Sequence, residues 1–423
     1  MKIHHLICTG SLALVLSQAA ALAHAPDLPA PWALWSDNIP SGNYLAPLLT
    51  LQQALPDYRN TPLQETAFEY LGFYQSFVGD YPGAVATFDQ LLEPQDWGKV
   101  DWRAGDKPLP AVATIVAEAD KHQAIFINEA HHRPQHRALT TQLLAGLYAK
   151  GYRYFSAEAL ATDPELAQRG YPLRGQSGTY TDEPVFGDML RTALKLGYKI
   201  VPYEDNSNCV ESPEQTDTCQ NQRERNQALH LQERIFKQDP KARVLVHAGY
   251  GHIEERESQG WKPMGSVFKE LTGIDPWTFD QIEMNEHSAP RFESPFYANT
   301  LAHDPISQPT LFRKPDGSFW TGFYKGNYDA LIVTPRSQYR LGRPNWLLTG
   351  DRRLQDLGTD VCPQLPCLVQ AFSSGEDPAA VPRDQILISQ AEPAALALTP
   401  GQYQIRVQNA AGTIIKSYAL TVK

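Results

Sequence analysis

The stretch AIFINEAHHRPQHRALTTQLL, residues 124–144, places acidic and basic side chains directly after an apolar run. Within nine residues it contains Glu129, His131, His132 and Arg137. A neutral imidazole can accept a proton from water while a carboxylate fixes its tautomer and stabilises the imidazolium. Alternatively, two histidines with one or two carboxylates can hold a divalent metal ion and leave one position open for water. The stretch therefore predicts a centre that activates water, with or without a metal ion.

Other ionisable residues follow apolar segments elsewhere in the chain. Glu158 ends the segment YRYFSAE, and Glu204 ends the segment KIVPYE. The segment RVLVHAG contains His247 and leads to His252. Ligands of open parallel sheets bind outside the carboxyl ends of the strands. If these segments are neighbouring parallel strands, we expect their acids and imidazoles to lie together in one cleft.

Each of these residues has a predicted role. His132 is the expected general base for an attacking water, and Glu129 and Glu158 orient it. His252 is expected to stabilise the tetrahedral intermediate. In a metal-dependent version, the ligands are Glu129, His132 and His252. Guanidinium and imidazole groups stabilise anions and developing oxyanions, so the residues expected to contact the substrate are His131, Arg137, Arg223 and His247.

From about residue 110 the chain alternates between strand-like and helix-like patterns. Short apolar runs predict strands at 124–128, 152–158, 199–204, 243–249, 277–283 and 328–335. Amphipathic periodicity predicts helices at 136–150, 184–197, 221–238 and around 263–272. This alternation is typical of an α/β protein in which a parallel sheet is flanked by helices. We assign residues 110–350 to this domain.

The regions on either side of this domain have different patterns. Residues 26–109 are expected to form an N-terminal helical region, in which residues 61–93 predict two helices joined by a turn at residues 79–81. This helical hairpin resembles a tetratricopeptide unit, and a single unit is expected to pack onto the main domain because an array needs several. Residues 360–423 contain short β runs separated by turn residues, which predicts a small C-terminal β-sandwich-like domain.

The first 25 residues resemble a secretory signal peptide. Lys2 precedes an apolar, Ala-rich stretch, and AHA at residues 23–25 has the small-x-small form of a cleavage site. No later segment has the ~18 to 20 apolar residues of a membrane span. The expected location is therefore the periplasm or the extracellular space. In such a compartment close cysteine pairs form disulfides, and the expected pairs are Cys209–Cys219 and Cys362–Cys367.

The formal net charge of −10 disfavours non-specific binding to nucleic acid or to an anionic membrane surface. We expect a small-molecule or peptide substrate instead. The N-terminal helices are a candidate surface for a protein partner.

The chain resembles the superfamily of erythromycin esterases, ChaN-like haem-uptake proteins and TIKI/TraB proteases over about residues 110–285. The resemblance rests on four segments in order: NEAHHRPQHR (128–137), GYRYFSAEAL (151–160), QRERNQA (222–228) and VLVHAGYGHI (244–253). It implies that the site residues are Glu129, His132, Glu158, Arg223, Glu224 and His252. His131 competes with His132, because ChaN-like spacing puts histidine two residues after glutamate.

Two positions depart from the family pattern. Asn128 stands where the family usually has glycine, which is expected to crowd the approach to the strand end. Gln227 replaces the hydrophobic residue that is common in the helix motif. These departures bear on catalytic competence and not on the fold.

The resemblance and the residue pattern together imply three functional hypotheses. The first is a secreted or periplasmic hydrolase that activates water with a Glu/His cluster at the carboxyl edge of the sheet, either metal-free or assisted by a divalent metal ion. The second is a haem- or metal-binding uptake protein of the ChaN-like type, which uses the His131/His132 pair. The third is a non-catalytic scaffold whose N-terminal helices and C-terminal β domain recognise other proteins.

Overall fold

Six strands from distant parts of the chain form one parallel sheet in the computed structural model, which describes residues 28–92, 105–205, 207, 209, 218–322, 324 and 326–423. Their order across the sheet is β4-β3-β5-β2-β6-β8. The strands are β2 (Ala124–Glu129), β3 (Tyr154–Ala157), β4 (Lys199–Ile200), β5 (Val244–Gly249), β6 (Trp277–Asp280) and β8 (Ala330–Leu331). The predicted α/β class is confirmed, and the predicted signal peptide lies outside the described residues.

The two central strands are buried on both faces. Every residue of β2 and β5 is buried, and a parallel strand covered on both sides needs a continuous apolar run. The two strands pair so that Glu129 lies opposite Gly249, and β3 pairs with β5 so that Ala157 lies opposite His247. The residues that follow β2, β3 and β5 therefore emerge at the same edge of the sheet.

The outer strands are shorter than the sequence pattern predicts. β4 ends at Ile200 and not at residue 204, and Pro202 has no N–H with which to extend the ladder. β8 covers only part of the predicted segment 328–335, and Val333 instead forms an antiparallel bridge with Thr310. Glu204 still reaches the edge of the sheet, where its carboxylate accepts a hydrogen bond from the backbone N–H of Ala159 (3.4 Å).

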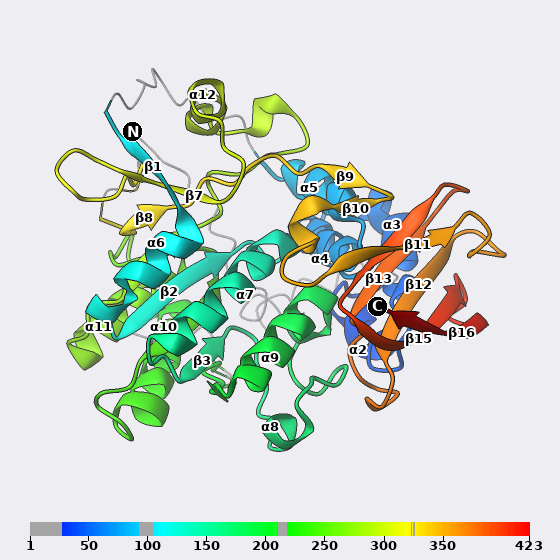
Figure 1. Ribbon diagram of the computed structural model, residues 1–423, viewed down its shortest axis with the longest axis horizontal. Helices are drawn as coiled ribbons and strands as arrows, with labels where there is room; N and C mark the ends of the chain where they lie inside the picture. Colours follow the sequence, from blue (N-terminus) through cyan, green and yellow to red (C-terminus); the bar gives the residue numbers. More distant parts are fainter. Residues whose placement is uncertain are drawn as a thin grey trace.

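Helices cover both faces of the sheet (Figure 1). On one face, α6 (Ala111–Glu118), α7 (Pro134–Ala149) and α9 (Pro184–Leu196) pack with Ile125 and Ile127 of β2. On the other face, α10 (Cys219–Leu231) and α11 (Met264–Thr272) pack with Phe126. Successive side chains of a strand point to opposite faces, so β2 contributes to both clusters.

The N-terminal region is helical, as predicted. Its helices are α2 (Ala33–Asn38), α3 (Leu45–Tyr58), α4 (Gln64–Phe77) and α5 (Tyr81–Asp89). α4 and α5 form a hairpin, and Asp80 caps α5 by accepting a hydrogen bond from the backbone N–H of Gly83 (3.0 Å). Apolar residues of α3 and α4 belong to the same hydrophobic cluster as those of α7 and α9. The N-terminal helices and one face of the sheet therefore share a core.

The C-terminal region consists of antiparallel sheets. β11 (Arg353–Gly358) pairs with β14 (Ala394–Leu398), and a second sheet has the order β13-β12-β15-β16. Its strands are β12 (Cys367–Ser373), β13 (Asp384–Ile388), β15 (Gly401–Asn409) and β16 (Ile414–Val422). The side-chain amide of Gln385 donates a hydrogen bond to the carbonyl of Phe77 (2.6 Å), and the N–H of Leu387 donates to that of Val78 (2.8 Å). The C-terminal strands thus hold the turn between α4 and α5, beside which they lie in Figure 1.

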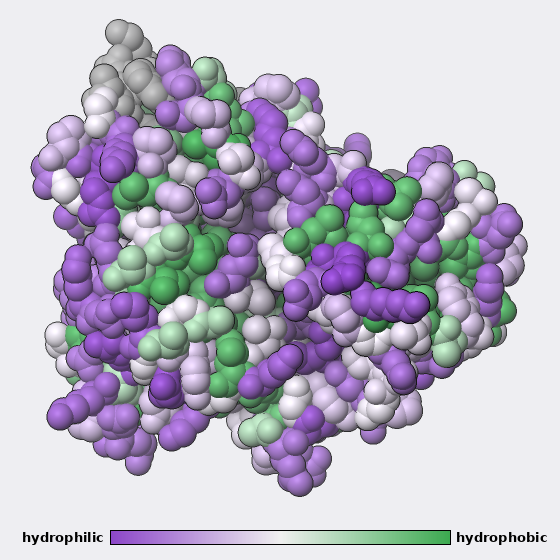
Figure 2. Space-filling view, in the orientation of Figure 1, coloured by the Kyte–Doolittle hydropathy of each residue, from purple (hydrophilic) through white to green (hydrophobic). Residues whose placement is uncertain are grey.

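Shorter elements connect these parts: α8 (Leu166–Arg169), α12 (Pro295–His303), β1 (Lys107–Pro110), β7 (Thr310–Arg313), β9 (Tyr339–Arg340) and β10 (Arg343–Pro344). The predicted disulfides Cys209–Cys219 and Cys362–Cys367 are both present. Among the described residues, no helix combines the length and the apolar character that crossing a bilayer requires. Polar side chains cover much of the face drawn in Figure 2, and apolar groups form several separate patches on it.

Candidate active site

Glu129, the last residue of β2, is the centre of a buried polar network. Arg137 of α7 donates two hydrogen bonds to its carboxylate, from Nε to Oε2 (2.6 Å) and from Nη2 to Oε1 (2.7 Å). His131 Nδ1 lies 2.8 Å from Oε1, and His247 Nε2 lies 2.7 Å from Oε2. Burial alone would raise the pKa of Glu129, but Arg137 and His247 outweigh burial and hold that pKa well below its ordinary value. Glu129 is therefore ionised at neutral pH.

Arg137 also ties this network to a second buried acid. Its Nη1 donates a hydrogen bond to Glu183 Oε2 (3.0 Å). Glu183 is the N-cap of α9, where its side chain accepts hydrogen bonds from the backbone N–H groups of Val185 and Phe186. A buried guanidinium is tolerated where acids and carbonyls pair its N–H groups. One cation therefore fixes α7 and α9 relative to the end of β2.

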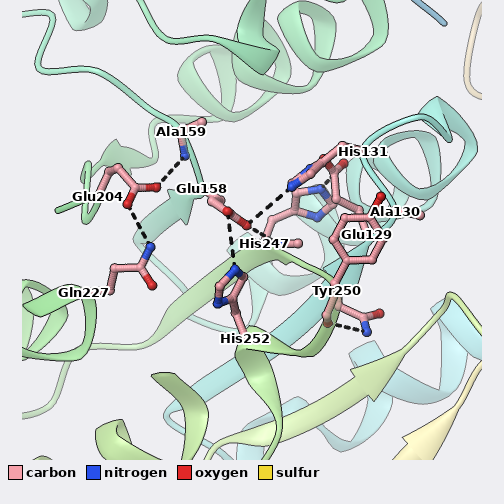
Figure 3. A network of polar contacts seen from close by, with 12 residues as sticks. Glu129, Ala130, His131, Glu158, Ala159, Glu204, Gln227, His247, Tyr250 and His252 are labelled. Atoms are coloured by element: carbon pink, nitrogen blue, oxygen red, sulfur yellow. Dashed lines mark hydrogen bonds and ion pairs between the residues drawn. The ribbon is translucent and has the colours of Figure 1, made fainter. Parts of the chain in front are cut away.

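His131 lies between Glu129 and Glu158 (Figure 3). Because ionised Glu129 can only accept a hydrogen bond, the neutral His131 ring carries its proton on Nδ1 and has an unprotonated Nε2. That Nε2 lies 3.9 Å from Glu158 Oε2, a separation too long for a direct hydrogen bond. Tyr180 stacks on the ring, with centroids 3.9 Å apart. His131 thus has the tautomer and the position of a general base.

Glu158 directly follows β3 and faces several positive groups. Arg223 Nη2 donates a hydrogen bond to Oε1 (3.0 Å), and the backbone N–H of Gly249 donates to Oε2. Burial would raise the pKa of Glu158, but His252 and Arg223 are among the groups that outweigh burial and lower it. Only glycine fits at position 249 without a rearrangement, because a Cβ there would lie 2.5 Å from His131 Nε2 and 2.7 Å from Glu158 Oε2.

His252 approaches Glu158 from another direction (Figure 3). Its Nε2 lies 3.6 Å from Glu158 Oε1 and 3.2 Å from Arg223 Nη1, and its Nδ1 lies 2.6 Å from Glu224 Oε1. Burial would lower the pKa of His252, but Glu224 and Glu158 outweigh burial and raise it. These acids favour the imidazolium form, which is the form that can donate a proton.

Arg223 of α10 pairs with Glu204 as well as with Glu158. Its Nε donates a hydrogen bond to Glu204 Oε1 (2.9 Å), and its Nη2 donates to Glu204 Oε2 (2.8 Å). Gln227, one turn later on α10, also donates to Glu204 Oε1 (2.9 Å). Gln227 is therefore a partner of this acid.

His132 is the predicted site residue that the structure places elsewhere. Its ring stacks on Phe88 of α5, with centroids 3.6 Å apart and planes 12° apart. Its Nδ1 has no hydrogen-bond partner among the described residues, and burial lowers its pKa well below the ordinary value. His131, and not His132, contacts Glu129 and Glu158. The expected position of His132 at the reaction centre is thereby corrected.

The four residues predicted to contact the substrate are all buried. Besides its contact with Glu129, His247 has its Nδ1 3.0 Å from the hydroxyl oxygen of Thr140. Both ring nitrogens of His247 therefore have protein partners, as does the guanidinium of Arg137. Of the four, Arg223 lines the cavity described next.

A cavity of about 30 Å³ adjoins Glu158, with Glu204 and Arg223 in its wall. This volume has room for about one water molecule. The other side of the cavity is aromatic, and most of its rings belong to α4: the aromatic lining residues are Trp35, Tyr70, Phe73, Tyr74, Phe77 and Tyr180. The N-terminal helices therefore build part of the site and shield it from bulk water.

Two residues beside the site have a left-handed backbone conformation. Ala159, which follows Glu158, has φ of 60°, and Tyr250, which follows Gly249, has φ of 44°. Such strain costs of the order of 1 kcal/mol or more in residues other than glycine and clusters at functional sites. Asn128 holds the second of these turns, because its Nδ2 donates a hydrogen bond to the carbonyl of Tyr250 (2.9 Å). Asn128 therefore fastens a loop of the site and does not crowd it.

The site residues do not fit a metal ion. Among the described residues, no group of three or more His, Cys, Asp or Glu side chains is arranged to hold one. The predicted ligands Glu129, His132 and His252 are not brought together, since His132 stacks on α5 instead. The guanidinium groups of Arg137 and Arg223 occupy the acids of the site and would repel a divalent cation.

Haem is not accommodated by the adjacent histidines either. The rings of His131 and His132 are stacked against Tyr180 and Phe88 respectively, and both side chains are buried. An imidazole binds haem iron through a nitrogen lone pair in the plane of its ring, and the burial of both side chains leaves no room beside these nitrogens for a large planar group.

Sequence reasoning missed three residues that shape the site. Glu183 carried a local signal, because an acid followed by proline is typical of a helix start. Tyr180 had no such signal, and Gly249 lies within the quoted segment VLVHAGYGHI but was not singled out. Their importance depends on contacts with His131, and these contacts exist only once the chain is folded.

No family model matches the chain, and no curated protein matches it. Among solved structures, the type III effector HopBA1 aligns with a TM-score of 0.30 and 12% identity, over 44% of this chain and 91% of that chain. RRSP, a MARTX toxin effector domain from Vibrio vulnificus, aligns with a TM-score of 0.31 and 12% identity, over 57% of this chain and 52% of that chain. A structure described as bacterial protein toxins has a TM-score of 0.31 and 12% identity, over 51% and 45% of the two chains. Likeness at this level does not bear on function.

Proposed function

We propose that the protein is a hydrolase in which His131 activates a water molecule for attack on an ester or amide carbonyl. The observation that carries the proposal is the contact between ionised Glu129 and His131 Nδ1, which leaves an unprotonated Nε2 on the side of Glu158. A carboxylate that fixes the imidazole tautomer is the arrangement by which general bases work in acyl transfer. The role predicted for His132 passes to His131.

The surrounding residues supply the remaining proton transfer and the charge stabilisation that hydrolysis needs. His131 Nε2 accepts a proton from the water while the water oxygen bonds to the carbonyl carbon. Glu129 stabilises the imidazolium, and Arg223 stabilises the oxyanion of the tetrahedral intermediate. His252 in its imidazolium form then donates a proton to the leaving alkoxide or amine as the C–O or C–N bond breaks.

Two further observations support this assignment and a location outside the cytosol. The four motif segments resemble a superfamily that includes esterases and proteases, whose substrates are esters and amides. The signal-peptide-like start and the two disulfides favour the periplasm or the extracellular space. A small molecule or a peptide is the substrate class that we propose.

The test replaces the two adjacent histidines separately by alanine. Hydrolysis of 4-nitrophenyl esters and peptide 4-nitroanilides is measured for each variant, together with the free energy of unfolding. We expect His131→Ala to lower kcat/KM by about 100-fold or more, because general-base catalysis contributes at least that much. His132→Ala, which removes a ring stacked on Phe88, serves as the matched control and should change kcat/KM by less than about tenfold.

Three results would contradict the proposal. The first is full activity in His131→Ala, and the second is an equal loss of activity in both variants. The third is the absence of turnover by the unaltered protein across esters and anilides of varied size and charge.

A further inference from the structure

A second cavity, of about 130 Å³, shares His252 with the proposed active site. Four aromatic residues line it: Tyr250, Trp261, Tyr324 and Tyr328. The rings of Tyr324 and Tyr328 meet edge to face with centroids 5.9 Å apart, and Trp261 meets His252 in the same manner at 6.3 Å. Aromatic faces attract organic cations that come within about 6 Å of the ring centre.

Three carboxyl groups line the same cavity: Glu254, Asp280 and Glu283. Within the part of the chain that the structure describes, their hydrogen-bond donors are neutral groups. Asn327 donates to Glu254 (2.7 Å), and Tyr324 donates to Glu283 (3.1 Å).

The acids of this cavity differ from those of the proposed active site in their charged partners. Glu129, Glu158 and Glu204 each form an ion pair with an arginine, whereas Glu254, Asp280 and Glu283 form none with any described lysine or arginine. Burial, with a contribution from Asp280, raises the pKa of Glu254 and of Glu283 to about 7. A cation in the cavity would therefore compensate acids that no described lysine or arginine pairs, in addition to His252, whose charge lowers the pKa of Glu254.

Gln220 of α10 also lines the cavity. Its Nε2 donates a hydrogen bond to Glu224 Oε1 (2.6 Å), which orients the amide. Its Oε1 is buried and accepts no hydrogen bond from the described residues.

We propose that this cavity binds a guanidinium or primary ammonium group and is the subsite for a cationic group of the substrate. The aromatic rings and the three acids are complementary to the positive charge and the N–H donors of either group. Only the assignment of the cation to a substrate rests on the proposed hydrolase function. Through His252 the cavity places that cation next to the bond to be cleaved. The substrate class is therefore an ester or amide with an arginine-like or lysine-like group.

The test measures binding by the full-length protein and does not need turnover. N-acetyl-L-arginine amide is compared with N-acetyl-L-citrulline amide, its neutral near-isostere, by isothermal titration calorimetry. A second pair, n-butylammonium and n-butanol, distinguishes an ammonium from a guanidinium source. We expect each cation to bind at least about tenfold more tightly than its neutral partner, since a desolvated cation over aromatic rings gains about that much.

Variants place the ligand in this cavity. Glu254→Gln and Glu283→Gln should each weaken binding of the arginine amide by about tenfold. Glu255→Gln is the matched control, because Glu255 is the neighbouring acid and its side chain binds Thr278 and Lys269 outside the cavity lining. Tyr324→Leu removes a partly exposed ring and tests the aromatic wall without altering charge.

The outcomes separate this inference from the proposed function. Equal affinity for the arginine and citrulline amides overturns it, and so does unchanged affinity in Glu254→Gln, Glu283→Gln and Tyr324→Leu. Cation-selective binding that these variants weaken supports it, even in a protein that hydrolyses no ester or amide. In that case the hydrolase proposal fails alone and the cavity remains a cation site.

Discussion

Gly249→Ala is the smallest change that should disable the proposed site. Gly249 has φ of −76° and ψ of 146°, which alanine adopts without strain. The added Cβ would nevertheless lie 2.5 Å from His131 Nε2, whereas ordinary contacts begin at 3.4 Å. The imidazole must therefore move by roughly 1 Å, and a misplacement of about 1 Å costs about 100-fold in rate. The same overpacking should lower the free energy of unfolding by about 1 to 3 kcal/mol.

The assay measures kcat/KM on the best substrate of the ester and anilide series, together with urea unfolding. Gly187→Ala on α9 is the matched control, because its Cβ would meet Val381 (2.9 Å from Cγ1) and Arg191, which are not among the reacting groups. We expect comparable destabilisation in the two variants and a large loss of activity in Gly249→Ala alone. The reasoning is refuted if Gly249→Ala keeps its activity within about threefold, or if Gly187→Ala loses as much.

Glu224→Gln should move the alkaline limb of the pH–rate profile to lower pH. The rate falls as rising pH deprotonates His252, and without Glu224 the pKa of His252 is lower; an unmoved limb would remove His252 as the acid. Arg137→Met should lower the free energy of unfolding by about 3 to 5 kcal/mol in urea titrations, because it leaves two carboxylates buried without their cation. Replacing Cys209 and Cys219 by serine should lower that free energy by roughly 3 kcal/mol, since the crosslink spans a sequence separation of 10 residues. In that variant, reductant should cause little further loss of unfolding free energy from this loop.

The order of strands and helices could be predicted because its signals are local. The buried runs of β2 and β5 and the amphipathic pattern of α9 appear within a few residues of sequence. Strand lengths at the edges could not be predicted equally well, since a short strand such as β4 depends on its neighbour and on the position of Pro202. The convergence of Glu129 and Glu158 followed from the parallel sheet once its edge was known.

The local sequence pattern could not decide which of His131 and His132 faces the other site residues. The side chains of adjacent loop residues point in different directions, and residue spacing does not specify those directions. The contacts that decide the matter come from distant elements: Glu158 and Tyr180 face His131, and Phe88 of α5 lies under His132. The second cavity was missed for the same reason, since its rings and acids come from separate loops.

Because α4 contributes most of the aromatic wall, the groups that react and the groups that select the substrate lie on different elements. The acids and imidazoles sit on the sheet side, whereas the shape of the space in front of Glu158 is set by a helix that carries no reacting group. Exchanging the rings of that helix should retune which molecules are accepted while the reaction itself persists. Diversification of this protein would therefore be concentrated in its first hundred residues, far along the chain from the groups that perform the chemistry.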